Sequence, residues 1–326
     1  MSRNAGTLTG SKLDLLSRLS TIVADTGEIE QIKRFRPHDC TTNPSLLLKA
    51  AQLDAYRDLI DEAVQWGRGK NGNREVNIDA IIDRLAVNFG RELLEIVPGY
   101  VSTEVDAVLS FDIEGSINKA QHFIRMYEEL GVSRERVLIK LASTWEGIEA
   151  ARVLQREGIN CNMTLIFSLA QAVACAEAGA FLVSPFVGRI TDWYRAAQGR
   201  DFEPSEDPGV QSVCSIYDYF KAHGIDTIVM AASFRVTGQV LELAGCDRLT
   251  IAPPLLEELD GTQGEVTKQL DPAASRAKDI AKLDLDEKAF RWHLNQDPMA
   301  TDKLAEGIRR FYEDTIKLRE HIATLV

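Results

Sequence analysis

Short runs of apolar and β-branched residues alternate along this chain with longer segments of helical periodicity. The helical pattern is clearest over residues 78–97, where Ile82, Leu85, Phe89 and Leu93 recur every three or four residues. Several of the short runs are almost continuously apolar, which is typical of parallel strands covered on both faces. The predicted strands are 21–25, 40–42, 100–105, 137–141, 161–167, 181–187, 227–231 and 249–252.

Eight strands joined by helical crossovers favour a closed (β/α)8 TIM barrel of the α/β class. A doubly wound open sheet is the alternative that this pattern leaves open. We expect one catalytic domain over residues 1–326, with an N-terminal extension or helix at 1–20 and additional C-terminal helices at 287–326. The last segment has apolar residues that we expect to dock over the barrel or against a second subunit: Trp292, Leu294, Met299, Leu304, Ile308 and Phe311.

Local signals predict where several helices begin and end. Ser143 precedes Glu146 by three residues, and Ser168 precedes Gln171 by the same spacing, which is a capping-box pattern. Glycine is favoured where a helix ends in a left-handed residue. Five glycines fall just before predicted strands: Gly131, Gly158, Gly179, Gly224 and Gly245.

Composition narrows the class of protein and of partner. The chain has 326 residues, 45% of them hydrophobic and 26% charged, which is typical of a globular protein with a large core. A net charge of -12 argues against nucleic acid or an anionic membrane as a partner, because both require an extended positive surface. The five cysteines include no C-x-x-C pair, and neither a signal core nor a long apolar span occurs, so we expect reduced thiols and a cytoplasmic location.

Polar residues gather at the expected carboxyl ends of the strands, where the active sites of such barrels lie. In chain order they are Asp25, Thr41, Asn43, Glu104, Lys140, Asn162, Thr164, Ser184, Arg189, Ser233 and Arg235. Charged groups in strands this apolar are costly to bury unless they are paired or functional. We therefore expect these side chains to meet at one site.

Lys140 interrupts the aliphatic run 137–141, and alternation places it on the face opposite Ile139 and Leu141, toward the barrel interior. Burial disfavours the charged form of a lysine, and the uncharged amine is the form that attacks a carbonyl. A structural lysine paired with Glu104 or Asp25 is the alternative. Those two carboxylates could instead handle protons beside the amine, although each could equally be an ion pair or a helix cap.

Arg189 and Arg235 offer the local positive charge that a phosphorylated substrate would need in so acidic a protein. Surface salt bridges are the alternative for both residues. The five histidines lack ligand spacing, and the chain has no phosphate-binding glycine loop or nucleophile elbow. We therefore expect neither a metal nor a bound cofactor.

The strand-end blocks, taken in order, resemble the transaldolase family over nearly the whole chain. They are Val23–Gly27, Thr41–Ser45, Ser102–Asp106, Ile139–Thr144, Gly158–Thr164, Ser184–Arg189, Ala232–Arg235 and Asn295–Ala300. The resemblance implies a cofactor-free transfer of a dihydroxyacetone unit between phosphorylated sugars of the pentose phosphate pathway. It also suggests a homodimer.

By position, the resemblance makes Lys140 the Schiff-base lysine, Glu104 with Thr164 the group that moves protons through a water, and Asp25 the base in carbon–carbon cleavage. It implies that the remaining matched residues bind substrate: Asn43, Thr41, Asn162, Ser184, Phe186, Arg189, Ser233 and Arg235. Shorter sugar-phosphate aldolases, which release free dihydroxyacetone, typically carry Gln where Glu104 stands and Tyr where Phe186 stands. Such an aldolase and a silent sugar-phosphate-binding barrel are the competing hypotheses. Ala231, where the family commonly has Gly, is a departure that concerns local packing.

Overall fold

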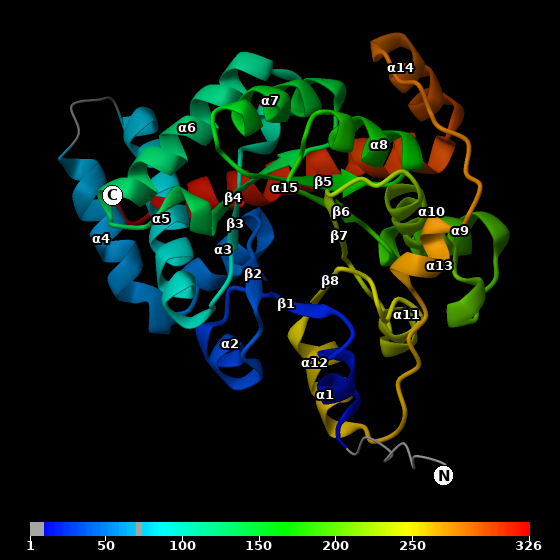
Figure 1. The fold of residues 1–326 in the computed structure, drawn as a ribbon. Coiled ribbons are helices and arrows are strands. Elements are labelled where there is room, and N and C mark those ends of the chain that lie inside the picture. The colour runs from blue at the N-terminus through cyan, green and yellow to red at the C-terminus, as the bar shows by residue number, and fades with distance from the viewer. Residues whose placement is uncertain (1–9, 70–73) are drawn as a thin grey trace.

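The computed structural model describes residues 10–69 and 74–326, and its centre is a closed barrel of eight parallel strands in chain order. Figure 1 shows the barrel strands with helices around them. The strands are β1 Thr21–Asp25, β2 Asp39–Thr41, β3 Val101–Glu104, β4 Val137–Ala142, β5 Cys161–Ile166, β6 Leu182–Pro185, β7 Ile228–Ala231 and β8 Arg248–Ile251. Pairing of β1 with β8 closes the barrel, so the TIM-barrel prediction is confirmed and the open sheet is wrong.

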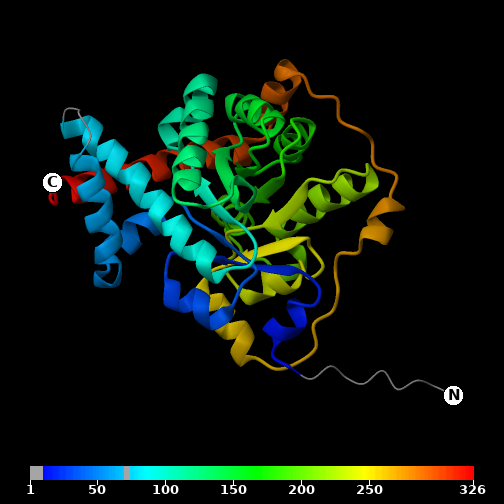
Figure 2. The same cartoon turned by 60° about the vertical axis from the view of Figure 1, so that its left-hand side comes forward.

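Helices surround the barrel and cover the outer faces of its strands, as the two views together show (Figures 1 and 2). The α-helices are α1 Lys12–Leu16, α2 Ile29–Phe35, α3 Pro44–Ala51, α4 Arg57–Arg68, α5 Arg74–Ile96, α6 Ile113–Glu129, α7 Trp145–Arg156, α8 Leu169–Glu177, α9 Gly188–Gln198, α10 Pro208–Ala222, α11 Thr237–Leu241, α12 Pro253–Gly261, α13 Pro272–Arg276, α14 Glu287–Gln296 and α15 Pro298–Ala323. Short 3-10 helices are η1 Asp54–Tyr56, η2 Ala107–Phe111, η3 Arg134–Arg136 and η4 Pro204–Glu206. Residues 1–9 of the predicted N-terminal segment lie outside the described residues.

The predicted helix ends are largely confirmed. Ser168 caps α8 and accepts a hydrogen bond from the backbone N–H of Gln171. The cap of α7 is Thr144 rather than Ser143, because the Ser143 hydroxyl donates instead to the carbonyl oxygen of Thr164 at 2.8 Å. The glycines that precede strands have positive φ, from 64° at Gly224 to 101° at Gly245, as a left-handed helix end requires.

Helix α15 runs across the carboxyl ends of the strands and contacts α3, α5, α9 and η2 (Figure 1). Its apolar residues are buried against side chains at the ends of β5 and β6: Met299, Leu304, Ile308 and Phe311 pack with Leu165, Phe167 and Phe186. Docking over the barrel is therefore confirmed for this helix. Trp292 of α14 is 59% exposed and takes no part in that core.

The register of the strands decides which side chains share the barrel interior. In a parallel pair, opposite residues point to the same face of the sheet. Glu104 on β3 lies opposite Lys140 on β4, and Lys140 lies opposite Asn162 on β5. These three neighbouring strands thus direct a carboxylate, an amine and an amide to the same face of the sheet.

All five cysteines carry free thiols, and each except Cys214 is buried. Within the described ranges, no helix has both the length and the apolar character needed to span a bilayer.

Candidate active site

A cavity opens at the carboxyl end of the barrel and encloses about 870 Å³, counting its open mouth. Its lining includes most of the polar residues predicted from the sequence: Asp25, Thr41, Asn43, Lys140, Thr164, Ser184, Arg189, Ser233 and Arg235, together with Phe186. Glu104 and Asn162 do not line it directly. The cavity is therefore assembled from the ends of strands far apart in the sequence, as expected for this fold.

Lys140 projects from β4 into this cavity and is only 5% exposed. Its Nζ lies 2.9 Å from Oε2 of Glu104 and 3.4 Å from the carbonyl oxygen of Thr42. The two interpretations offered by the sequence, an amine in a cavity and a paired structural lysine, therefore both describe the same side chain.

Glu104 is enclosed beside the amine, and burial raises the pKa of its carboxyl group, against a lowering effect from Lys140 and Arg189. Two opposite charges in so dry a place are costly to desolvate. An amine beside a carboxyl group is the pair of groups that imine chemistry uses as nucleophile and proton donor.

Asp25 provides a second carboxylate on the other side of the cavity, at the end of β1. Burial raises the pKa of Asp25, whereas Lys140 and the Thr41 hydroxyl lower it. The Thr41 hydroxyl donates to Oδ1 of Asp25 at 3.1 Å and lies 3.1 Å from the hydroxyl of Thr250. Thr41 therefore positions the carboxylate, which is a role that the sequence assigned only as substrate binding.

The floor of the cavity is formed by β5 and β6. Thr164 is fully buried, and its Oγ1 has no hydrogen-bond partner among residues 10–69 and 74–326, so it is available to a molecule in the cavity. Asn162 lies one layer deeper and is also fully buried. Its amide donates to the Ser102 hydroxyl at 3.0 Å and accepts from Ser184 at 2.6 Å, so Ser184 lies between Asn162 and the cavity.

The mouth of the cavity carries positive charge. Burial and the nearby guanidinium groups of Arg310 and Arg235 lower the pKa of Arg189. The Nη1 atom of Arg189 is buried without a hydrogen-bond partner in the described part of the chain. Arg235 is held 2.8 Å from Asp192 and 3.3 Å from the Ser233 hydroxyl. Guanidinium groups that repel one another, one of them with an unused buried donor, form a site suited to an anion.

Ser233 and Asn43 occupy special backbone positions at this cavity. Ser233 has a φ of 62°, a left-handed conformation that is uncommon for residues other than glycine and clusters at functional sites. Asn43 caps α3 through its side-chain oxygen, which accepts from the backbone N–H of Leu46 at 3.0 Å. Its amide nitrogen is the group left to contact a ligand.

Two aromatic rings form one wall of the cavity, and the sequence pointed to only one of them. Arg189 Cζ lies 5.0 Å from the ring centre of Phe186 and 5.5 Å from that of Phe311. Lys140 Nζ is 5.7 Å from the ring centre of Phe311. Phe311 was predicted only to dock α15, because periodicity identifies the apolar face of a helix but not which of its residues reaches the site.

Comparison with known proteins agrees with this geometry. A model of the family described as Transaldolase/Fructose-6-phosphate aldolase matches residues 22–322. The chain belongs to this family. Among similar proteins named transaldolase, that of Shewanella baltica is 59% identical over 94% of this chain and 96% of its own length. Those of Aliivibrio salmonicida and Agrobacterium fabrum are each 57% identical over 96% of this chain, and over 98% and 97% of their own lengths.

Within residues 10–69 and 74–326, no group of three or more His, Cys, Asp and Glu side chains could hold a metal ion.

The departure from the family at Ala231 is accommodated at the end of β7, where the residue is fully buried in the barrel wall.

The contact between Thr41 and Asp25 gives a testable expectation for the pH dependence of catalysis. A hydrogen bond to an ionised carboxylate lowers its pKa, so Thr41→Val should raise the pKa of Asp25 further. If Asp25 must be ionised to act as a base, the acid limb of the pH profile of kcat/KM should then move to higher pH. Thr250→Val is the matched control, because Thr250 contacts Thr41 but not Asp25. An acid limb that stays in place, or moves to lower pH, in Thr41→Val would contradict this role.

Proposed function

We propose that this chain is a transaldolase that uses Lys140 as its Schiff-base residue. It transfers a dihydroxyacetone unit from sedoheptulose 7-phosphate or fructose 6-phosphate to glyceraldehyde 3-phosphate or erythrose 4-phosphate, in the non-oxidative pentose phosphate pathway. The observation that carries this proposal is a buried lysine whose Nζ contacts one carboxylate at 2.9 Å while a second carboxylate lines the same cavity. Family membership and relatives named transaldolase support it.

Imine formation begins when the neutral amine of Lys140 attacks C2 of the ketose. Glu104 donates a proton to the hydroxyl that leaves as water, and takes it back during imine hydrolysis. Its raised pKa suits this exchange, because the protonated form of the carboxyl is accessible closer to neutral pH. Thr164, whose Oγ1 has no protein partner within the described chain, holds the water involved.

Carbon–carbon cleavage follows from the protonated imine, which withdraws electrons from C3. Asp25 removes the proton of the C4 hydroxyl, the C3–C4 bond breaks, and its electron pair forms an enamine on the lysine. The first aldehyde leaves while the three-carbon unit stays covalently bound. In transfer, C3 of the enamine adds to the carbonyl carbon of the second aldehyde, and Asp25 returns its proton to the new hydroxyl.

Binding of the sugar is shared between the floor and the mouth of the cavity. Asn43 and Ser184, the latter positioned by Asn162, contact the hydroxyls of the three-carbon unit. Arg189, Arg235 and Ser233 hold the phosphate group at the mouth. Thr41 and Phe186 complete the wall around the substrate.

Removal of Arg235 should weaken phosphate binding more than it slows imine chemistry. A charge-assisted hydrogen bond contributes up to a few kcal/mol, and Arg235 is partly exposed, so we expect Arg235→Ala to raise KM for fructose 6-phosphate about tenfold. Trapping of free dihydroxyacetone on Lys140 should change little, since that molecule has no phosphate. Arg195→Ala is the control, because Arg195 lies on α9, the helix that also carries Arg189, but pairs with the exposed Asp201. If the substitution impaired binding of fructose 6-phosphate and trapping of dihydroxyacetone to the same extent, Arg235 would not act by binding phosphate.

The activity itself is tested by supplying fructose 6-phosphate with or without erythrose 4-phosphate. A transaldolase forms sedoheptulose 7-phosphate and glyceraldehyde 3-phosphate, and releases little free dihydroxyacetone when the acceptor is present. An aldolase releases dihydroxyacetone in proportion to the ketose consumed, whether or not the acceptor is added. The second result would replace the proposed function with the aldolase alternative.

We also propose that the chain acts as a single catalytic domain and as a homodimer in the cytoplasm, without a cofactor. The free thiols of all five cysteines support a reducing compartment. The dimer rests on the family resemblance, and sedimentation of the purified chain at twice its monomer mass would support it.

A further inference from the structure

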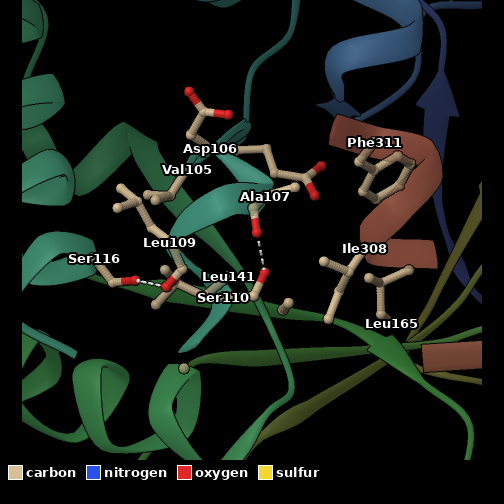
Figure 3. A pocket seen from close by; sticks show the side chains of 13 residues that line it. Val105, Asp106, Ala107, Leu109, Ser110, Ser116, Leu141, Leu165, Ile308 and Phe311 are labelled. Carbon is tan, nitrogen blue, oxygen red and sulfur yellow. Dashed lines mark hydrogen bonds between the residues drawn. The ribbon is translucent and has the colours of Figure 1, made fainter. Parts of the chain in front are cut away.

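A second, smaller pocket lies beside the substrate cavity, between the η2 segment and α15 (Figure 3). It encloses about 310 Å³, counting its open mouth. Its lining combines Glu104 with Ser110 and Ser116 and with the apolar side chains of Leu165, Ile308 and Phe311. The proposed proton donor of the reaction is therefore reached from two sides: by Lys140 in the main cavity, and by this side pocket.

Phe311 lines both spaces. Figure 3 shows its ring projecting from α15 on the same side of the pocket as Ile308 and Leu165, opposite the η2 residues Ala107 and Ser110. The side chain is 4% exposed, and its ring centre is 5.7 Å from Lys140 Nζ. The ring thus borders both the small pocket and the cavity of the amine, beside Glu104, which reaches the amine from the pocket side.

The local backbone holds this ring close to the barrel. Leu165 has a φ of 57°, at a place where the pairing of β5 with β6 is irregular, and its side chain packs under α15. Gly307, one turn before Phe311, allows this approach, because a Cβ there would lie 2.7 Å from Cδ2 of Leu165. A left-handed leucine is a strained conformation of the kind that persists where the surrounding structure requires it.

We propose that Phe311 is a specificity-determining residue that favours transfer over hydrolysis by separating the side pocket from the substrate cavity. This inference rests on the proposed function. After cleavage the bound three-carbon unit has two fates. It adds to an aldehyde, or it is protonated at C3 to give an imine that water hydrolyses.

In hydrolysis, the oxygen of water bonds to C2 and the C2–Nζ bond breaks. The protonated imine and one water give dihydroxyacetone and the lysine ammonium, so atoms and charge balance. The side pocket has room for about one water molecule beside the Glu104 carboxyl. The hydroxyls of Ser110 and Ser116 donate to the carbonyl oxygens of Ala107 and Leu109, so their oxygens are left to accept from that water. Water held by Thr164 in the main cavity is one source for hydrolysis. The Phe311 ring limits a second source, the side pocket, and so slows hydrolysis relative to transfer.

The test is the ratio of free dihydroxyacetone released to sedoheptulose 7-phosphate formed, measured with fructose 6-phosphate and a fixed concentration of erythrose 4-phosphate. Both products come from one intermediate, so the ratio does not depend on how much enzyme is folded. We expect Phe311→Ala to raise it about tenfold, equivalent to about 1.4 kcal/mol between the two barriers. Phe311→Leu, which disturbs the core less, should raise it by a smaller factor.

Tyr312→Ala is the matched control, because Tyr312 is the next residue of α15 and is 44% exposed; its ratio should equal that of the parent chain. Ile308→Phe places a ring in the side pocket and should lower the ratio.

An unchanged ratio in both Phe311→Leu and Phe311→Ala, or in Phe311→Leu alone if the alanine variant is insoluble, would overturn the inference. Failure of the proposed function would look different, because the parent chain itself would then form no sedoheptulose 7-phosphate.

Discussion

Lys140→Arg should abolish transfer, lowering kcat by roughly 10⁴-fold or more, because the step that forms a covalent bond to the substrate is lost. Arginine keeps the positive charge beside Glu104, so the ion pair at 2.9 Å and the local electrostatics are largely retained. A guanidinium group cannot lose its proton in a protein and therefore cannot form an imine. The measurement is kcat for transfer from fructose 6-phosphate to erythrose 4-phosphate.

Two further variants test whether the loss of activity comes from the loss of the amine nucleophile of Lys140. Lys140→Met removes the charge and the nucleophile together, and should be as inactive as the arginine variant if the nucleophile is what matters. Lys33→Met is the neutral control, because Lys33 is exposed on α2, where it forms an ion pair with Glu30. Substantial activity in Lys140→Arg would show that the charge of Lys140, and not its nucleophilicity, serves the reaction.

Asp25→Asn should slow cleavage of fructose 6-phosphate by about 10²- to 10⁴-fold, which is the range for loss of a positioned general base. An amide accepts no proton from the C4 hydroxyl, whereas its size lets it keep the contact with Thr41. Imine formation with free dihydroxyacetone has no C3–C4 bond to break, so trapping of that adduct on Lys140 should remain within a few-fold of the parent chain.

The comparison of those two readouts separates a base in cleavage from a carboxylate that only orients the lysine. Asp39→Asn is not a suitable control, because Asp39 forms an ion pair with Arg248 inside the barrel. Asp192→Asn is suitable for the chemical step, because Asp192 lies at the mouth beside Arg235. If Asp25→Asn loses imine formation and cleavage to the same extent, Asp25 has no separate role in carbon–carbon chemistry.

The sequence predicted all eight strands to within two residues at almost every end, because buried parallel strands are continuously apolar and glycines mark the preceding helix ends. It also placed Lys140 in the barrel interior, since a strand alternates its side chains between two faces. The convergence of Asp25, Lys140 and Arg189 follows from the fold, because parallel strands that close into a barrel end on one face.

Other features depend on side-chain choices that local patterns do not determine. The N-cap of α7 is Thr144 and not the predicted Ser143, because the Ser143 hydroxyl donates to the carbonyl oxygen of Thr164, which is distant in sequence. Asn162 lies beneath Ser184 rather than at the cavity surface, a difference of one layer in depth. Phe311 reaches the site where α15 packs closely on the barrel through Gly307 and the left-handed Leu165, residues more than a hundred positions apart.

The central claim is that the amine of Lys140 carries half of a sugar as a covalent intermediate, and borohydride reduction tests it most directly. The chain is incubated with fructose 6-phosphate, reduced, digested and examined by peptide mass analysis. We expect one three-carbon adduct, located on Lys140, and none in Lys140→Arg. A fully active chain that yields no adduct, or an adduct confined to another lysine, would contradict the mechanism proposed for this cavity.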